Sequence, residues 1–383
     1  MVLKVRSGLG TTCVNEVQSL FAMAVLALAL VGCQAATSTS PTSSTHVYIA
    51  GKLGTSSSSF VPVYWKDGVL NYLPLNTGAT NGGVWGAAED SSGNLYFAGG
   101  QTNSPVGYWK NSTYTALTLG STYTAGNTGP IAVDSSGNVW VVAEVGVSSL
   151  TTFVYWKNGV GPTVIPGSPD NVWGIQADLS GNVYFFGTEE NGNGMVGYIW
   201  KNGANPTINP LMGGNTNSSE SVGTLDSAGN VYAFANEWGT GTGGWFYWKV
   251  GSTTATALPT GNLTGWLASK GIAANSGNFG FIGIYGPGSA PTTLEYWANQ
   301  NSTPIAVTFP TGTTVTNSDT FDSAYDSKGN LITPVQLGNT YVSGTTGTLS
   351  DGTPYYLQNS TPIALPLGTG YTWGDVGWVV VGP

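Results

Sequence analysis

The chain has 383 residues and a formal net charge of −9, and only 8% of its residues are charged, about a third of the usual share. It has 10 Lys and Arg against 19 Asp and Glu, so we expect no nucleic-acid partner, which would need clustered basic residues. A single histidine excludes His-rich metal sites, and we expect neither a metal nor a cofactor.

Residues 1–33 are typical of a secretory signal. Lys4 and Arg6 precede the apolar run LFAMAVLALALVG, which is shorter than the ~18–20 residues that span a bilayer. The run ends in LVGC, which resembles a bacterial lipobox. The resemblance implies that Cys33 is lipidated and becomes the new N-terminus, and that Cys13 is removed. Gln34 follows in place of an aspartate retention signal, so we expect anchoring in the outer membrane, facing the periplasm or the cell surface.

Residues 34–45, QAATSTSPTSST, follow this signal. Their Ser, Thr, Ala and Pro composition gives them nothing to bury, which predicts a flexible tether. The remaining residues, 46–383, are expected to form one domain.

This domain repeats a short phrase, first seen as DSSGNLYFAG from residue 90. The asparagine of the phrase recurs every 44 to 52 residues, at positions 94, 138, 182, 230, 278 and 330. Such a period indicates a propeller or another repeat array. Short runs of Val, Tyr, Phe and Trp between Gly, Asn and Pro turns predict an all-β chain.

Each repeat divides into four predicted strands, as in residues 83–119. The phrase SSG joins the first two strands, and pairs such as Asp67-Gly68 and Asn158-Gly159 join the last two in two-residue hairpins. Four antiparallel strands are one propeller blade. The third strand carries a Tyr-Trp-Lys phrase, degenerate in the last unit, that occurs seven times along the chain.

The ends of the chain predict how the ring closes. The first unit begins at His46 without an inner strand, whereas the C-terminal segment YTWGDVGWVVVG has no unit of its own. We therefore expect this segment to complete the first blade as one long strand, which gives seven blades; eight is the alternative.

The D-x-x-G-N-[VL]-Y and Y-W-K-N-G phrases resemble those of bacterial secreted β-propeller repeat proteins. The resemblance covers nearly all of the chain after the tether, and it implies the fold without implying one function. Units six and seven depart from the pattern, with Ala298 and Gln358 in the place of lysine.

The repeated residues favour structural roles. Each D-x-x-G turn offers one carboxylate, too few for a calcium loop, so the aspartates are expected to cap their own turns. His46 lies where the tether meets the first strand, and we expect no catalytic role for it. Trp65 and its counterparts are expected to pack between blades, with the neighbouring lysine stems along the sheet.

The residues that differ between blades are the candidates for function. The loops that join strands two and three, and those that join strand four to the next unit, vary in every unit and should share one face of the ring. The candidates are the two-to-three loops 187–195, 236–245 and 336–353 and the four-to-one loops 76–85 and 165–173. We therefore expect a non-catalytic binding or scaffolding module that uses this face, with a protein or glycan partner. Aromatic side chains could stack on sugars, although packing between blades also explains them. The alternative is a carbohydrate-active enzyme, a glycoside hydrolase or lyase, that uses paired loop carboxylates. The candidate ligand-binding residues are Trp85, Trp173, Asp170, Glu189, Glu190, Glu237, Trp238 and Tyr341.

Overall fold

The computed structural model describes residues 45–382, except for 57–58, 124–125, 148–149, 191–193, 209–214, 240–243, 259–271, 276, 286–292, 311–317, 320–321 and 338–351. The predicted signal segment, with Cys33, and the predicted tether up to residue 44 lie outside the described residues. The predictions made for them stay predictions. No helix in the described part of the chain is long and apolar enough to cross a membrane.

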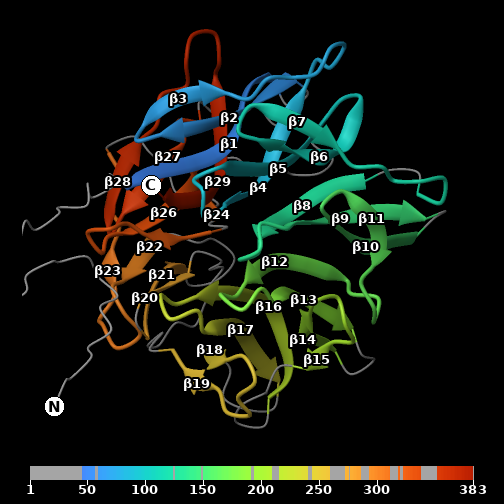
Figure 1. The fold of residues 1–383 in the computed structure, drawn as a ribbon. Helices are drawn as coiled ribbons and strands as arrows, with labels where there is room; N and C mark the ends of the chain where they lie inside the picture. The colour runs from blue at the N-terminus through green and yellow to red at the C-terminus, as the bar shows by residue number, and fades with distance from the viewer. Residues whose placement is uncertain are drawn as a thin grey trace, which may run out of the picture. The chain divides into compact units, whose positions relative to one another are not determined.

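Residues 46–382 form seven antiparallel sheets arranged in a ring, a seven-bladed β-propeller, as predicted (Figure 1). Blade 1 consists, from the centre outwards, of β29 (Trp373–Gly382), β1 (His46–Ser56), β2 (Ser59–Lys66) and β3 (Val69–Tyr72). Blade 2 consists of β4 (Gly82–Glu89), β5 (Leu95–Gln101), β6 (Ser104–Lys110) and β7 (Thr113–Ala116). Blade 3 consists of β8 (Gly126–Val133), β9 (Val139–Val147), β10 (Leu150–Lys157) and β11 (Val160–Val164).

The remaining four blades follow the same order. Blade 4 consists of β12 (Asn171–Ala177), β13 (Val183–Glu190), β14 (Met195–Lys201) and β15 (Thr207–Ile208). Blade 5 consists of β16 (Asn215–Leu225), β17 (Val231–Gly239), β18 (Gly244–Lys249) and β19 (Thr256–Ala257). Blade 6 consists of β20 (Ile272–Asn275), β21 (Asn278–Tyr285), β22 (Thr293–Trp297) and β23 (Ile305–Ala306). In blade 7, β24 (Ser318–Asp319) and β25 (Ala324–Tyr325) both pair with β26 (Leu331–Leu337), followed by β27 (Tyr355–Gln358) and β28 (Thr361–Ala364).

The C-terminal strand closes the ring, as the sequence predicted. β29 pairs antiparallel with β1 over its whole length, from Trp373 opposite Gly54 to Gly382 opposite His46. Gly377 has no partner in this register, so it forms a bulge within one continuous strand. The first and last strands of the domain therefore share one sheet, which leaves no unpaired edge at the seam.

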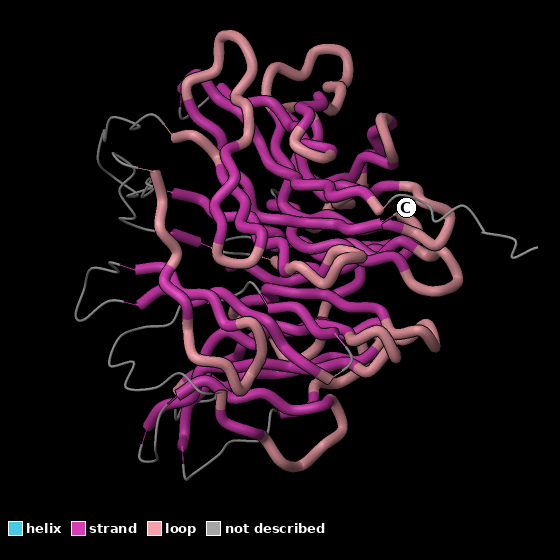
Figure 2. Tube along the Cα trace, turned by 90° about the vertical axis from the view of Figure 1, so that its left-hand side faces the viewer, coloured by secondary structure: helices cyan, strands magenta, loops and turns pink. Residues whose placement is uncertain are grey.

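The strands run between two faces of the ring, which Figure 2 shows from the side with loops at both. On one face lie the two-residue hairpins, in which Asp67, Asn158 and Asn202 have φ near +50° and are each followed by a glycine. On the opposite face the two variable sets of loops meet: the Thr102 N–H, from a two-to-three loop, donates to the Asn81 carbonyl of a four-to-one loop at 3.0 Å. This second face is called the variable face below.

The variable loops are shorter than predicted. Their Gly, Ser and Thr residues indicated loops, but the ladders continue through them, for example from Ser56 opposite Ser59 and from Val147 opposite Leu150. β13 runs to Glu190 and β17 to Gly239, so the predicted loops 187–195 and 236–245 begin inside strands. The predicted loops 76–85 and 165–173 likewise end inside β4 and β12.

The core lies between neighbouring blades. Trp109, on β6, is fully buried in a cluster that includes Ala50 of blade 1, Leu73 of the connector and Phe97 of blade 2. Trp65 occupies the same place between blades 7 and 1, beside Ile332. The prediction that the repeated tryptophan fills the space between blades is confirmed.

Candidate functional site

The predicted aromatic residues Trp85 and Trp173 lie at matching β-bulges in the innermost strands of blades 2 and 4. The register of β4 against β5 shifts between Val84 and Gly86, and that of β12 against β13 shifts between Val172 and Gly174. A bulge leaves one residue unpaired and re-aims its side chain. Here the re-aimed residue in both innermost strands is a tryptophan.

The two tryptophans contribute to different hollows. Trp173 is 40% exposed and lines the central channel of the ring. Trp85 is half-buried and lines a separate cleft formed by blades 1, 2 and 3. The indole ring of Trp85 lies over Gly83. A Cβ added to Gly83 would be only 2.8 Å from Cη2 of Trp85.

The structure brings three predicted acids together at the end of blade 4. Asp170, just before β12, accepts a 2.5 Å hydrogen bond from the backbone N–H of Glu190. Burial, and then the negative charge of Asp170, raise the pKa of Glu189. Asp170 thus fastens the end of β13 to the segment that leads into β12.

The other predicted residues lie apart from this group. Glu237, on β17, is only 1% exposed, so it is a buried strand residue and not a loop acid. Trp238 follows it with its backbone paired to Asn217, while its side chain is not among those described. Tyr341 lies outside the described residues.

The cleft beside Trp85 has a volume of about 530 Å³ and opens near the variable face. The aromatic rings of Phe60, from β2, and Trp85 form part of its wall. Thr102 and Asn127 are exposed polar residues of the lining, and Gln101 is a buried one. None of the described residues that line the cleft is charged.

Lys52 connects the two aromatic rings without lining the cleft. Its Nζ lies 5.4 Å from the ring centre of Phe60 and 5.6 Å from that of Trp85. The same Nζ is 3.0 Å from Oδ2 of Asp375 on β29. The ion pair and the two cation–π contacts hold the rings in place and compensate the lysine charge.

Gln101 is the residue of the cleft that sequence analysis missed. It ends β5, is 4% exposed, and accepts a 2.8 Å hydrogen bond from the Asn76 N–H on its Oε1. Its buried Nε2 has no partner among the described residues. A signal was present, because Gln101 stands seven residues after the turn asparagine, the position that Glu189 and Glu237 hold in blades 4 and 5.

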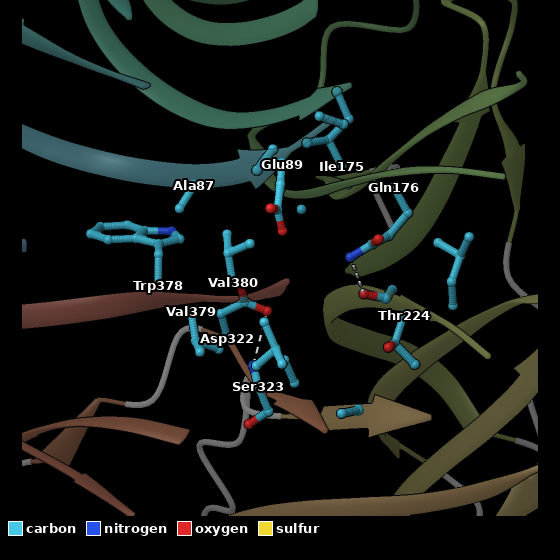
Figure 3. A pocket seen from close by; sticks show the side chains of 18 of the residues that line it. Ala87, Glu89, Ile175, Gln176, Thr224, Asp322, Ser323, Trp378, Val379 and Val380 are labelled. Atoms are coloured by element: carbon cyan, nitrogen blue, oxygen red, sulfur yellow. Dashed lines mark hydrogen bonds between the residues drawn. The ribbon is translucent and has the colours of Figure 1, made fainter. Parts of the chain in front are cut away.

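The central channel is the larger hollow, a cavity of about 740 Å³ lined by the innermost strands of all seven blades. Figure 3 shows that the carboxylates of Glu89, at the end of β4, and Asp322, before β25, both point into it. The described lining includes no Lys, Arg or His. Neither acid was among the predicted site residues, because both lie beside the repeated turns and not in the variable loops.

The two channel acids have perturbed protonation. Burial raises the pKa of Asp322 to about 7, although the Ser323 and Val379 N–H groups donate to its carboxylate. Burial, and then the charge of Asp90, raise the pKa of Glu89, while His46 lowers it. Asp322 is particular to blade 7: four residues before the turn aspartate, blades 2, 3, 4 and 5 have Gly86, Pro130, Gly174 and Val222.

The repeated aspartates cap their turns, as predicted. Oδ1 of Asp90 accepts 2.9 Å hydrogen bonds from the N–H groups of Ser92 and Asn94. Asn111, in the hairpin between β6 and β7, links that hairpin to the turn of Asp90. Its Oδ1 accepts a hydrogen bond from the Leu95 N–H, and its Nδ2 donates to Oδ1 of Asn94. His46 is likewise tied to a turn, with Nδ1 2.6 Å from Oδ2 of Asp67. In the described part of the chain, no group of three or more His, Cys, Asp and Glu could hold a metal ion.

Solved structures resemble this chain in fold at low sequence identity. A puromycin-hydrolysing peptidase of Mycobacterium tuberculosis matches with a TM-score of 0.54 and 9% identity, over 83% of this chain and 52% of the peptidase. An acylaminoacyl peptidase of Pyrococcus horikoshii gives 0.47 and 8%, over 85% and 51%. TolB from Acinetobacter baumannii gives 0.41 and 10%, over 65% and 60%.

The chain thus spans about half the length of either peptidase. No protein-family model matches the chain, and no curated protein matches its sequence. At such identities the likeness concerns the fold alone.

Proposed function

We propose that this protein is a non-catalytic binding module of the bacterial cell envelope that holds a protein or glycan partner in the cleft beside Trp85. The observation that carries the proposal is the cleft itself. It combines two fixed aromatic rings with a buried polar side chain, and it has a volume of about 530 Å³, within the usual range of ligand sites.

The rigidity of the surroundings supports binding there. Phe60 and Trp85 come from different blades, and Lys52 holds both rings through its ion pair with Asp375. Sites held on strands lose less entropy on binding than sites on long loops. The envelope location rests on the signal segment and on the predicted lipidation of Cys33, which would tether the propeller to the outer membrane.

Co-sedimentation with purified cell-envelope fractions tests this function. A fragment beginning at residue 44 contains all seven sheets and lacks Cys33, so lipidation cannot carry it to the pellet. We expect the fragment to sediment with the envelope and Trp85→Ala to remain in the supernatant. Trp173→Ala is the matched control, because it changes a bulge tryptophan outside the cleft. Equal sedimentation of all three proteins would contradict a role for the cleft.

A second candidate function is an enzyme that uses the central channel, and not the loop acids first considered. The observation that favours it is the pair Glu89 and Asp322, two carboxyl groups that face one cavity (Figure 3). With a pKa of about 7, Asp322 could donate a proton near neutral pH. Hydrolysis or elimination of glycosides by the wild type, lost in Asp322→Asn and in Glu89→Gln, would support this candidate; activity unchanged by both substitutions would exclude it.

A further inference from the structure

We infer that the cleft beside Trp85 takes a neutral saccharide, one oxygen of which accepts a hydrogen bond from Nε2 of Gln101. This inference rests on the proposed function, since it names the ligand chemistry of the same cleft. It depends on three observations: which atom of the Gln101 amide is the donor, how deeply that amide is buried, and the lack of charged side chains in the described lining.

The orientation of the Gln101 amide is fixed by the backbone. The N–H of Asn76 donates to its side chain at 2.8 Å, so the atom that it meets must be the oxygen. The remaining atom of the amide is therefore the NH₂ group, which can only donate. A ligand that satisfies it must present an acceptor oxygen, such as a hydroxyl or a ring oxygen.

The burial of this amide is costly without a ligand. Gln101 is 4% exposed, and no described residue accepts from its Nε2, which is itself closed to solvent. A ligand oxygen in the cleft therefore meets this donor only after a small rotation of the Gln101 side chain. An unsatisfied buried donor destabilises a fold, whereas apolar side chains at such a position do not. The equivalent positions in blades 1 and 3 hold Leu53 and Val145, both buried, so packing alone does not require an amide there.

The lack of charge and the two aromatic rings further restrict the class of ligand that the cleft can bind. The described lining has no charged side chain, and Lys52 is compensated by Asp375 at 3.0 Å. An anionic or cationic ligand would thus lose its hydration without gaining a counter-charge. The rings of Phe60 and Trp85 instead offer apolar surfaces for the C–H faces of a sugar ring.

A peptide is the less favoured occupant. A peptide that binds as an added β-strand needs a free sheet edge. β5, which carries Gln101, is paired on both sides by β4 and β6, so its main chain offers no such edge. A saccharide needs only side-chain partners, which this cleft supplies.

The test is an array of neutral oligosaccharides, uronic-acid oligosaccharides and peptides, screened with the purified protein. The affinity for any ligand that binds is then measured by calorimetry. The key variant is Gln101→Glu, which keeps the acceptor for Asn76 and replaces the donor. We expect binding among the neutral sugars only, and a loss of about tenfold in Gln101→Glu, the usual effect of one hydrogen bond.

Gln101→Met is the second variant, because it removes the donor without adding a charge and so covers the case in which Gln101→Glu fails to fold. It should lose affinity to a similar extent. Neutral sugars that bind with undiminished affinity to both variants would overturn the role of Gln101. Binding of peptides alone, or of acidic sugars alone, would overturn the inference of a neutral saccharide and leave the cleft as a binding site. If no ligand on the array binds, and if Trp85→Ala sediments with the envelope like the wild type, both the saccharide inference and the proposed function of the cleft would be overturned.

Discussion

The indole N–H of Trp109 donates a 2.8 Å hydrogen bond to the carbonyl oxygen of Pro74, in the connector that enters blade 2. Trp65 and Trp200 make the same bond to Pro366 and Pro166, at 2.9 and 2.7 Å. Each tryptophan therefore fastens the third strand of its blade to the chain that leads into that blade. The tryptophan of the repeated Tyr-Trp-Lys phrase thus has a structural role in the ring.

Replacement of this tryptophan should weaken the fold. Trp109→Ala leaves a large cavity between blades 1 and 2 and an unsatisfied Pro74 carbonyl, so we expect a loss of about 3–5 kcal/mol in the free energy of unfolding. Urea denaturation measures it. Leu150→Ala, at a residue that is 74% exposed, is the control and should change stability by less than about 0.5 kcal/mol. A neutral result for Trp109→Ala would reopen a binding role for the phrase.

The pairing of β1 with β29, which closes the ring, can be tested by adding one methyl group at Gly51. A Cβ on Gly51 would lie 1.9 Å from the Asp375 carbonyl oxygen, at the pairing of β1 with β29. Gly51→Ala should therefore destabilise the protein by about 1–3 kcal/mol, because the backbone of the seam must shift. Gly174→Ala is the matched control, since its Cβ meets nothing closer than 3.8 Å. Equal thermal midpoints for the two variants would argue against the seam.

The channel acid should make stability depend on pH. The pKa of Asp322 is raised by burial from 3.8 to about 7 in the folded state. Its ionisation therefore opposes folding as the pH rises from about 4 to above 7, and Asp322→Asn should stabilise the protein at about pH 8 but hardly at about pH 4. Urea midpoints at the two pH values measure this difference, and equal midpoints at the higher pH would contradict it.

Asp90, in a repeated turn, is the control, because it should change the dependence of stability on pH in the opposite direction to Asp322. Burial alone would raise its pKa, but hydrogen bonds from Asn94, Tyr96 and Ser92 outweigh this effect and lower it. The stability that Asp90 contributes is present above its ordinary pKa of 3.8 and is lost as the pH falls through the lower folded-state value. Asp90→Asn should thus destabilise the protein at about pH 8, and the difference should shrink below about pH 3.

The predicted anchor has a test of its own. Cys33→Ala removes the thiol that lipidation requires, so the protein should move from the membrane fraction to the soluble fraction when expressed in a bacterial host. Immunoblots of the two fractions measure the change. Ser7→Ala, within the same predicted signal segment, should leave the distribution as it is. Continued membrane association of Cys33→Ala would refute lipidation.

Much of the fold could be predicted from the sequence because local chemistry repeats. The turn of Asp90 and Asn94 and the hairpin of Asp67 and Gly68 each need particular residues, so their recurrence reports the blades directly. The seam was predictable from an incomplete first unit and a surplus C-terminal strand.

The candidate site was less predictable, because it depends on contacts between blades. Gly and Ser residues near Ser56 and Val147 indicated loops, yet a ladder can continue through any residue whose backbone groups find partners. The burial of Gln101 follows from blade packing, and its position beside Trp85 follows from a bulge in β4. Neither property can be read from local composition.

The affinity of the cleft for an oligosaccharide is the measurement that tests this account most directly. For the first neutral sugar that binds, calorimetry should give a Kd that rises about tenfold or more in Trp85→Ala, because the stacking surface is lost. Trp173→Ala, at the equivalent bulge of blade 4, should leave the Kd unchanged. A Kd that rises in Trp173→Ala and not in Trp85→Ala would place the ligand in the central channel and contradict the account.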